Sequence, residues 1–268
     1  MKELNHLSDI YKNYDTFVID LWGVVHNGMV LNPKAIEAIE QLEKNSKKIV
    51  FLSNAPRPSS KVINFLLKMN MNKKYLSNVM TSGEAAMHAI NKNKFGKSFF
   101  HLGPPRDTSV FEKVKDNRVD LESCDFIICT GLFDDHEDDL SYYKNLLEKQ
   151  TTKKMICTNP DLIVDRGNIR ELCAGSVAMV FEKMGGEVIY FGKPHAEVYS
   201  QSIDNVGKKV LAIGDNLNTD IKGANLLNYH SLLVCNGIHK EEIYKKGVGE
   251  VSKEYEAIVN FTQTELKW

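Results

Sequence analysis

The sequence predicts an α/β fold, a parallel sheet covered by helices, with a second and smaller α/β unit inserted into it. Short runs rich in β-branched and aromatic residues alternate with helical patterns, which is typical of a parallel sheet with crossover helices. Polar residues directly follow several of these apolar runs, where the strands of such a sheet would end. The middle of the chain is more polar than either flank, and we interpret it as the inserted unit.

The first part of the predicted core starts with a strand at residues 16–21, which is apolar until it meets Asp20. A helix follows in which Asn32 is the N-cap and Pro33 takes the first position, where a missing N–H does no harm. Further along, we expect strands at 48–53, 78–82 and 98–103 and helices within 59–69 and at 83–91.

The alternation continues near the C-terminus, with strands expected at 187–192, 209–215 and 229–235 and a helix after His195. We therefore predict that residues 1–103 and 174–268 form the core and that residues 104–173 form the inserted unit. Within it, long charged helices are expected around two apolar runs, at 125–131 and 153–159. Because no Pro/Gly/Ser linker flanks the insertion, we expect a folded module rather than a tether.

Charge and composition exclude several classes of protein. The 268 residues include 34 Lys+Arg and 35 Asp+Glu, and this net charge of -1 excludes a protein-wide electrostatic footprint for nucleic acid or membrane. No apolar run approaches the ~18 residues of a membrane-spanning helix. The first residues resemble neither a signal peptide nor a transit peptide. The five scattered cysteines then favour reduced thiols in a cytoplasmic protein.

Four polar clusters follow predicted strands, and the carboxyl ends of parallel strands face a common crevice. The clusters contain Asp20, Ser53, Lys193 and the pair Asp215 and Asp220. Carboxylates hold Mg²⁺ through hard oxygen ligands, a hydroxyl and an ammonium neutralise phosphoryl oxygens, and one carboxylate can attack phosphorus. The set of side chains therefore suits phosphoryl transfer.

The segments around these residues resemble the haloacid dehalogenase (HAD) superfamily, specifically its class IIA, NagD-like phosphatases. DLWGVVHNG looks like the first motif of the family, FLSNAPR like the second and FGKPHAEVY like the third. AIGDNLNTDIKGA is a close match to the fourth motif, and VMTSGEAA and CTNPDLIV look like other class IIA stretches. The resemblance covers nearly the whole chain. It implies a HAD-like, Rossmann-like core with a C2-type cap, and Mg²⁺-dependent hydrolysis of a small phosphorylated metabolite such as a sugar phosphate.

The same resemblance assigns the phosphate chemistry to individual residues. Asp20 would be the nucleophile that forms an aspartyl-phosphate. Ser53 and its neighbour Asn54 would bind the phosphoryl oxygens, and Lys193 would neutralise Asp20 and the phosphate together.

The implied metal site uses the first and fourth motifs. Asp215 would coordinate Mg²⁺ alongside Asp20 and the backbone carbonyl of Trp22, while Asp220 would support the metal or its waters. Asn159 and Asp161, near the return of the cap to the core, could bind substrate or shape a hinge. We favour the hinge, because clusters of Asn, Pro and Asp usually mark turns. Caps of this type often contribute to dimer contacts, so a homodimer is a further expectation.

One position departs from the family pattern. In the family's phosphatases an acid two residues after the nucleophile protonates the leaving group and later activates water. Here that position is Trp22, which can do neither, and such a proton shuttle is typically worth ~10²–10⁴-fold in rate. One interpretation is that Trp22 packs at the seam between cap and core of a weak phosphatase. Another is a phosphometabolite-binding protein that has lost turnover.

A metal-independent dehalogenase is the alternative enzyme, since an aromatic residue two positions after the nucleophile also resembles the dehalogenases themselves. Asp215 and Asp220 argue against it, because two acids would repel each other without a cation between them. The insertion also lies between the second and third motifs, where C2 caps occur.

Other polar residues are weaker candidates. His26 is the candidate for a substitute acid or base, because its pKa is ordinarily near neutrality, although a structural role is favoured. Arg57 and Arg106 are possible anion contacts, whereas His101 and His195 are expected to be structural. The acidic run at 134–139 is interpreted as a solvated surface rather than a metal site.

Overall fold

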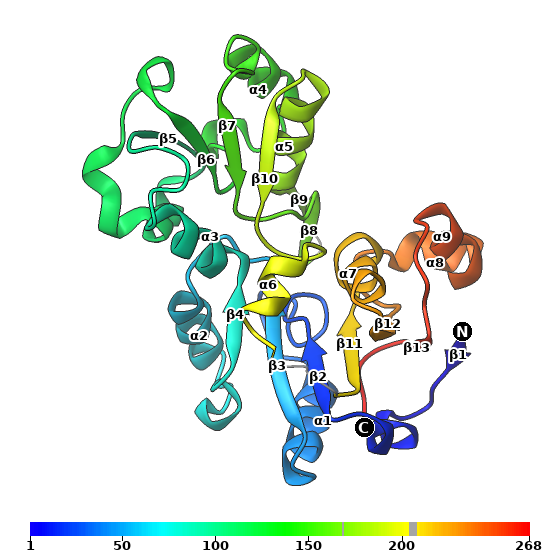
Figure 1. Cartoon of the computed structure of the whole chain (residues 1–268). Coiled ribbons are helices and arrows are strands. Elements are labelled where there is room, and N and C mark those ends of the chain that lie inside the picture. The colour runs from blue at the N-terminus through cyan, green and yellow to red at the C-terminus, as the bar shows by residue number, and fades with distance from the viewer. Residues whose placement is uncertain (168, 204–207) are drawn as a thin grey trace.

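The computed structural model describes residues 1–167, 169–203 and 208–268, which form two α/β lobes (Figure 1). The larger lobe is built on a seven-stranded sheet in which every paired neighbour is parallel. From edge to edge its strands are β1 (Lys2–Glu3), β13 (Phe261–Gln263), β12 (His230–Val234), β11 (Val210–Gly214), β2 (Thr16–Ile19), β3 (Lys48–Ser53) and β4 (Val79–Thr81). The predicted parallel-sheet core is confirmed.

Helices cover this sheet, as the buried faces of a parallel sheet require. The helices of the core lobe are α1 (Pro33–Lys44), α2 (Ser59–Lys68), α3 (Ser82–Ile90), α6 (Ala196–Ser200), α7 (Lys222–Leu226), α8 (Lys240–Lys246) and α9 (Val248–Glu254). The predicted start of α1 is confirmed: the Asn32 side chain accepts a hydrogen bond from the Lys34 backbone N–H at 3.1 Å, and Pro33 is the first helical residue. The helix buries Ala35, Ala38, Ile39 and Leu42 in the core.

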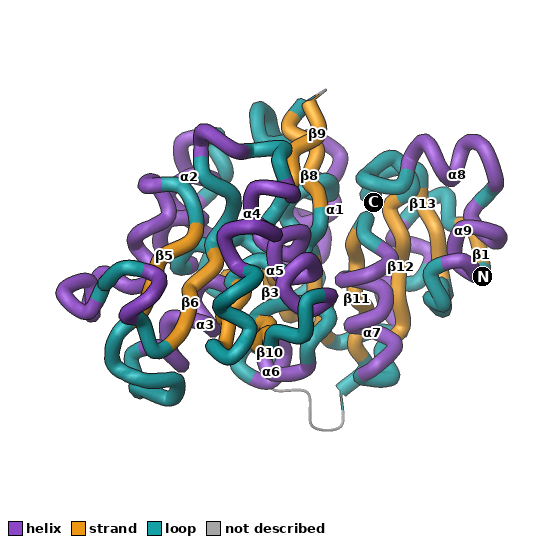
Figure 2. The backbone as a smooth tube through the Cα atoms, turned by 90° about the horizontal axis from the view of Figure 1, so that it is seen from above, coloured by secondary structure: helices purple, strands orange, loops and turns teal. Residues whose placement is uncertain are grey.

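The smaller lobe, here called the cap lobe, has its own four-stranded parallel sheet. The order of its strands is β10 (Glu187–Tyr190), β7 (Lys154–Cys157), β6 (Phe126–Cys129) and β5 (Phe99–Leu102). Helices α4 (Leu140–Leu147) and α5 (Ala174–Lys183) belong to this lobe. Seen from above, the cap lobe stands over the β3 and β4 side of the core sheet and leaves β12 and β13 uncovered (Figure 2).

The assignment of the strands at 98–103 and 187–192 to the core is wrong. Both strands form, but they are the outer strands β5 and β10 of the cap sheet. The predicted limits of the inserted unit, residues 104 and 173, therefore fall inside the stretch 99–190 that carries this sheet. An apolar run predicts a strand but not the sheet that the strand joins.

The long charged helices expected in the cap are also absent from its described residues. The segment Pro105–Asn117 forms a 3₁₀ run that is interrupted by non-helical backbone at Asp107, Phe111 and Val114. The acidic run at 134–139 gives a single 3₁₀ turn and the N-cap of α4, Asp139, whose side chain accepts from Tyr142 N at 3.1 Å. Side chains of Asp compete with the helical backbone for hydrogen bonds, which favours caps over helix interiors.

A short antiparallel hairpin, β8 (Ile163–Arg166) and β9 (Ile169–Leu172), lies between the two lobes and was not predicted.

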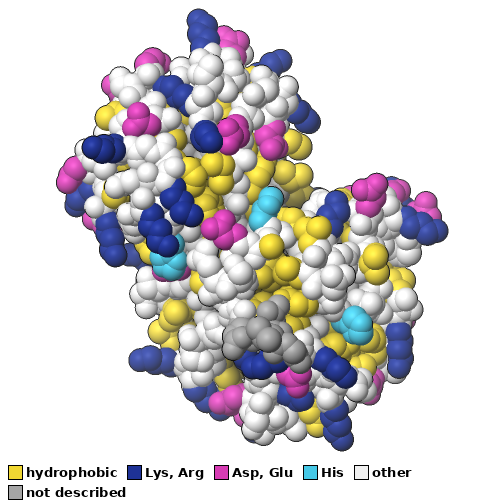
Figure 3. Space-filling model, in the orientation of Figure 1, with side chains coloured by type: hydrophobic (Ala, Val, Ile, Leu, Met, Phe, Trp, Pro, Cys, Tyr) yellow, Lys and Arg dark blue, Asp and Glu magenta, His cyan; other side chains and the backbone are white. Residues whose placement is uncertain are grey.

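On the face shown in Figure 3, positive and negative side chains are interspersed over both lobes. In the described part of the chain, no helix has the length and apolar character needed to cross a membrane.

Cys129 and Cys157 face each other in β6 and β7 as fully buried core residues, and burial raises the pKa of Cys129 to about 12.

The buried ring of His101 makes the stability of the cap lobe depend on pH. Its Nε2 lies 2.8 Å from Thr130 Oγ1, and the ring packs 4.7 Å from the ring of Phe111. Burial lowers the pKa of His101 to about 4, with Arg118 adding to the effect. Because the folded value lies below the unfolded value of about 6.5, the unfolded chain binds more protons between these pH values. The contribution to stability is therefore complete above pH ~6.5 and is lost as the pH falls toward 4.

We expect His101→Gln to flatten this dependence. Between pH 7 and pH 4.5 the wild type should lose about 2–3 kcal/mol more unfolding free energy than the variant. Urea unfolding across this range measures the difference, with His88→Gln as the control for losing an exposed imidazole. Equal losses in wild type and His101→Gln would contradict the assignment.

Candidate active site

Three carboxylates meet at the carboxyl edge of the core sheet. Asp20 is the first residue after β2, and Asp215 is the first residue after the adjacent strand β11. Asp220 lies in the π-helical turn Leu217–Ile221 that follows. All three are buried, and each offers an oxygen within 4.8 Å of the others. The strand order thus brings together the three acids that the sequence singled out.

Lys193 lies among these acids. Its Nζ donates to Asp20 Oδ1 at 2.5 Å and to Asp220 Oδ1 at 2.7 Å, and the side chain is buried. Burial alone would lower the pKa of Lys193, but the carboxylates of Asp20, Asp220 and Asp161 raise it above its ordinary value. The ammonium therefore stays charged.

A single ammonium does not balance three buried carboxylates. Burial raises the pKa of Asp20 to about 7, and the neighbouring Lys193 lowers it only in part. Burial and the charges of Asp20 and Asp220 raise the pKa of Asp215 well above its ordinary value. A divalent cation would restore the balance, and a set of carboxylate oxygens is the donor type that Mg²⁺ takes.

Backbone from two loops surrounds Asp215. A Cβ on Gly23, whose φ is +87°, would lie 2.2 Å from Asp215 Oδ2, and a Cβ on Gly237 would lie 2.1 Å from the same atom. The Ile238 backbone N–H donates to this oxygen at 2.8 Å. The two glycines allow the close approach that fixes the carboxylate in place.

The second motif contributes two residues to the site: Asn54 holds the backbone of Lys193, and Ser53 lines the cleft. Asn54 Nδ2 donates to the Lys193 carbonyl at 3.1 Å, and Asn54 Oδ1 accepts from the Lys193 N–H at 2.8 Å. The buried Asn54 amide, expected at the phosphate, thus braces the backbone that carries the ammonium. Ser53 lines the cleft, and its Oγ accepts from the Ala55 N–H at 3.2 Å, which leaves the hydroxyl proton for a ligand oxygen.

Asp161 joins the site from the cap side. Its Oδ1 accepts from Asn54 Nδ2 at 3.0 Å and from Asn216 Nδ2 at 3.4 Å, so a cap residue is bonded to two core motifs. Burial raises the pKa of Asp161 to about 6, although Lys193 opposes the shift. Asn159 also lines the cleft, but its Oδ1 accepts from the Asp161 N–H at 3.0 Å and holds the turn.

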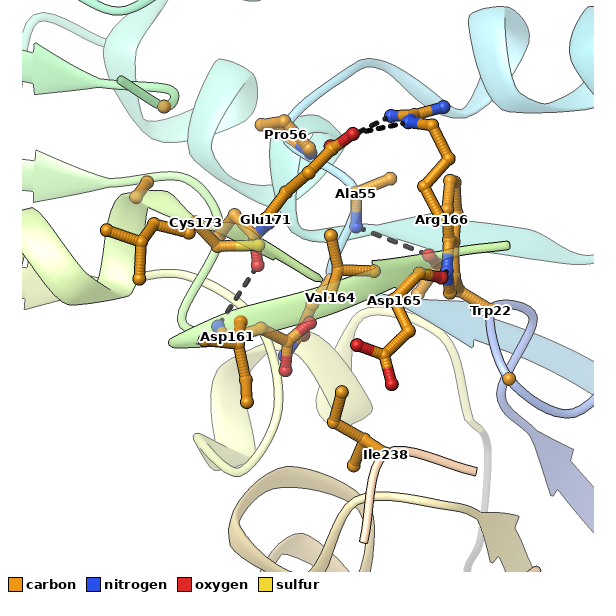
Figure 4. Close-up of a pocket in the computed structure, with 18 of the residues that line it drawn as sticks. Trp22, Ala55, Pro56, Asp161, Val164, Asp165, Arg166, Glu171, Cys173 and Ile238 are labelled. Carbon is orange, nitrogen blue, oxygen red and sulfur yellow. Dashed lines mark hydrogen bonds and ion pairs between the residues drawn. The ribbon is translucent and has the colours of Figure 1, made fainter. Parts of the chain in front are cut away.

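Trp22 contacts the hairpin rather than the acids. Its Nε1 donates to the Asp165 backbone carbonyl at 2.7 Å, and the Arg166 guanidinium lies 5.0 Å from the ring centroid. Figure 4 shows the indole against Arg166, which is paired in turn with Glu171. The indole lies at the seam between cap and core, where the sequence placed it.

His26 is enclosed in the loop that follows β2. Its Nδ1 accepts from the Gly28 N–H at 3.0 Å, and its ring contacts those of Trp22 and Phe65 at 5.0 and 5.6 Å. Burial lowers the pKa of His26 to about 4. A ring that is neutral at pH 7 cannot donate as an imidazolium, which favours the structural role.

The other candidate residues are engaged elsewhere. Arg57 forms an ion pair with Asp107, and Arg106 forms one with Asp134. The His195 ring stacks on Tyr190 with centroids 5.3 Å apart, and burial lowers the pKa of His195. Neither arginine is therefore a free anion contact.

The three acids and Lys193, together with Ser53, Trp22 and His26, line a cleft of about 1560 Å³ between the lobes. The volume exceeds the ~300–1,000 Å³ of many small-molecule sites, so a phosphate bound at Asp20 leaves room for a leaving group. Three contributors were missed by the sequence reasoning: Asn216, the Ile238 N–H and the hairpin. Asn216 lies inside the fourth motif, whereas a backbone N–H and a charged hairpin carry no local signal.

Most of the chain is similar to known hydrolases. Residues 17–115 match the family described as haloacid dehalogenase-like hydrolases, and residues 190–259 match a second, HAD hydrolase-like family. The curated 5′-nucleotidase YutF of Bacillus subtilis (strain 168) is 25% identical over 243 residues, 86% of this chain and 91% of YutF.

Solved structures extend the likeness to nearly every residue. A haloacid dehalogenase-like hydrolase from Brucella suis 1330 superposes with a TM-score of 0.86 at 27% identity, covering 99% of this chain and 100% of that chain. A glycerol phosphate phosphatase from Mycobacterium tuberculosis, solved in complex with magnesium, gives 0.64 at 22% identity, over 89% of this chain and 71% of that chain. At 22% identity, the similarity between this chain and the glycerol phosphate phosphatase shows a shared fold and nothing more.

Proposed function

Since this chain belongs to the haloacid dehalogenase-like hydrolases, in their NagD-like class IIA, we propose that it is a Mg²⁺-dependent phosphatase of a small phosphorylated metabolite. The observation that carries the proposal is the bonding of Lys193 to Asp20 beside the acids Asp215 and Asp220. The curated relative supports the reaction class, because it is a nucleotidase.

In the proposed mechanism an Asp20 oxygen attacks phosphorus, and the bond from phosphorus to the leaving oxygen breaks. With Trp22 in the place of the acid, the leaving oxygen departs as an anion and takes its proton from water. Water then hydrolyses the aspartyl-phosphate and releases phosphate. Lys193 neutralises both the attacking carboxylate and the phosphoryl oxygens, and Ser53 donates its hydroxyl proton to one of those oxygens.

The acids fit a resident Mg²⁺. Asp20, Asp215 and the Trp22 carbonyl would hold it, with Asp220 supporting it, and the ion would supply positive charge to the phosphoryl oxygens. The paired acids also argue against a dehalogenase that works without metal.

A second candidate function is binding of a phosphometabolite without turnover. The specific observation in its favour is Trp22, which occupies the place of the acid and is bonded to the hairpin. A protein of this kind would bind phosphate esters in the presence of Mg²⁺ and release no inorganic phosphate.

Removal of the metal tests the proposal directly. Chelation by EDTA is expected to abolish phosphate release from 4-nitrophenyl phosphate, and Mg²⁺ should restore it.

Asp215→Asn should raise the Mg²⁺ concentration for half-maximal activity at least ~10-fold, because an anionic ligand is lost while the shape is kept. Asp138→Asn, at an exposed acid of the cleft rim, is the matched control. Activity that is indifferent to metal in wild type and Asp215→Asn would refute the metal-dependent mechanism.

A further inference from the structure

The guanidinium groups in the cleft are already occupied. Within the described ranges, each arginine that lines the cleft forms an ion pair with a carboxylate. These pairs are Arg57 with Asp107, Arg106 with Asp134, Arg166 with Glu171 and Arg170 with Asp165. A guanidinium that is engaged in this way must give up its partner before it can bind an anion of the substrate.

Each of the two hairpin pairs has two nitrogen–oxygen contacts. Arg166 Nε lies 2.9 Å from Glu171 Oε1, and the same guanidinium lies over the Trp22 ring (Figure 4). Arg170 contacts both carboxylate oxygens of Asp165, at 2.8 and 3.0 Å, and donates to the Ile238 carbonyl of the core at 3.3 Å. Two-pronged guanidinium–carboxylate pairs are the stronger kind of ion pair. The positive charges of Arg166 and Arg170 on the cleft side are therefore neutralised by Glu171 and Asp165.

The charges that remain at the cleft are mainly negative. Lys61 and Lys240 line it without a salt bridge to any described residue, and both are exposed to solvent. Besides Asp161 and Asp215 of the site itself, four carboxylates of the lining are outside any salt bridge in the described ranges: Asp135, Glu137, Asp138 and Glu241. A leaving group with a second anion would meet this excess of negative charge and no free guanidinium.

We propose that the cleft selects phosphomonoesters whose leaving group is neutral or cationic and discriminates against those that carry a second phosphate or a carboxylate. Glu171 is the specificity-determining residue, because it occupies Arg166, the guanidinium that would otherwise face the cleft. This inference rests on the proposed phosphatase function and names the substrate class of the same site.

Three esters of similar size test the proposal. They are ethylene glycol monophosphate, O-phosphoethanolamine and 2-phosphoglycolate, whose leaving groups are neutral, cationic and anionic. We expect kcat/KM for the first two to exceed that for 2-phosphoglycolate by about tenfold at low salt, the size of one like-charge interaction. The gap should narrow at high ionic strength, which screens charges across a solvated cleft.

A pair of variants isolates the hairpin. Glu171→Gln releases Arg166 and should raise the ratio of kcat/KM for 2-phosphoglycolate to that for ethylene glycol monophosphate by about tenfold. Glu187→Gln removes another ion-paired glutamate of the cap lobe, one that pairs with Lys154 outside the cleft, and should leave the ratio unchanged. Comparing ratios cancels differences in leaving-group chemistry between the two esters.

Two results would overturn the proposal: wild type that prefers 2-phosphoglycolate, or a ratio that Glu171→Gln does not move. Failure of the phosphatase function itself looks different, because none of the esters and no 4-nitrophenyl phosphate would then be hydrolysed. In that case calorimetric Kd values for the same three esters, with Mg²⁺ present, decide the ranking. Equal Kd values, or the tightest binding for 2-phosphoglycolate, would again refute the selection.

Discussion

Asp20→Asn is expected to reduce phosphate release by on the order of 10⁴-fold or more while leaving the fold intact. The amide has nearly the same shape but cannot supply the attacking oxygen anion or its share of negative charge toward the metal. Lys193 keeps its 2.7 Å bond to Asp220, so the variant does not leave the buried ammonium unpaired. Steady-state phosphate release and thermal unfolding, measured together, separate loss of chemistry from loss of structure.

The matched control for this experiment is Asp161→Asn. Asp161 is a second acid of the same cleft, coupled electrostatically to Lys193, but it is hydrogen-bonded to Asn54 and Asn216 instead of to the ammonium. Its loss should cost far less activity than the loss of Asp20. Substantial turnover in a well-folded Asp20→Asn protein would remove Asp20 from the nucleophile role.

Trp22→Asp is expected to raise steady-state turnover by about 10²–10⁴-fold on alkyl phosphates, whose leaving oxygen most needs a proton. In the wild type the aspartyl-phosphate at Asp20 should accumulate, because the missing acid also fails to activate the attacking water. An activated acyl phosphate should therefore give a burst of one product per active site. The Asp variant should shrink that burst.

Trp22→Asn separates the acid from the lost indole. Both variants lose the bond to the Asp165 carbonyl and the contact with Arg166, but only the aspartate can move a proton. Removing a large aromatic side chain can cost ~3–5 kcal/mol where it is buried, so thermal unfolding of both variants accompanies the kinetics. If a folded Trp22→Asp protein is no faster than Trp22→Asn, the missing carboxylate does not limit this enzyme.

The sequence predicted the site through the ends of strands. Asp20 and Asp215 directly follow apolar runs that became the adjacent strands β2 and β11, so their meeting followed from the class of fold. Lys193 was expected to follow a strand of the core sheet, but it does not. The strand before it belongs to the cap sheet, and the lysine lies where the chain returns to the core.

The cap could not be predicted to the same depth. Which sheet β5 and β10 join depends on partners far away in the chain, and apolar patterning does not identify partners. The ion pairs of the hairpin could not be predicted for the same reason, because they too depend on which residues the strand pairing brings together. Arg166 and Arg170 look like lone surface arginines in the sequence, and only the register of β8 against β9 places Glu171 and Asp165 beside them.

The order in which the two sheets can form follows from the positions of their strands in the chain (Figure 1). All four strands of the cap sheet come from one continuous stretch, whereas β2 pairs with the much later β11 and β1 pairs with β13 near the C-terminus. Synthesis proceeds from the N-terminus, and long-range pairing must first close a long loop. We expect the cap lobe to fold on the ribosome while β2 and β3 still lack half of their sheet. Such a nascent chain carries an open strand edge and lacks Asp215 and Asp220, so chaperone contact and proteolysis should concentrate on the N-terminal strands until β11 emerges.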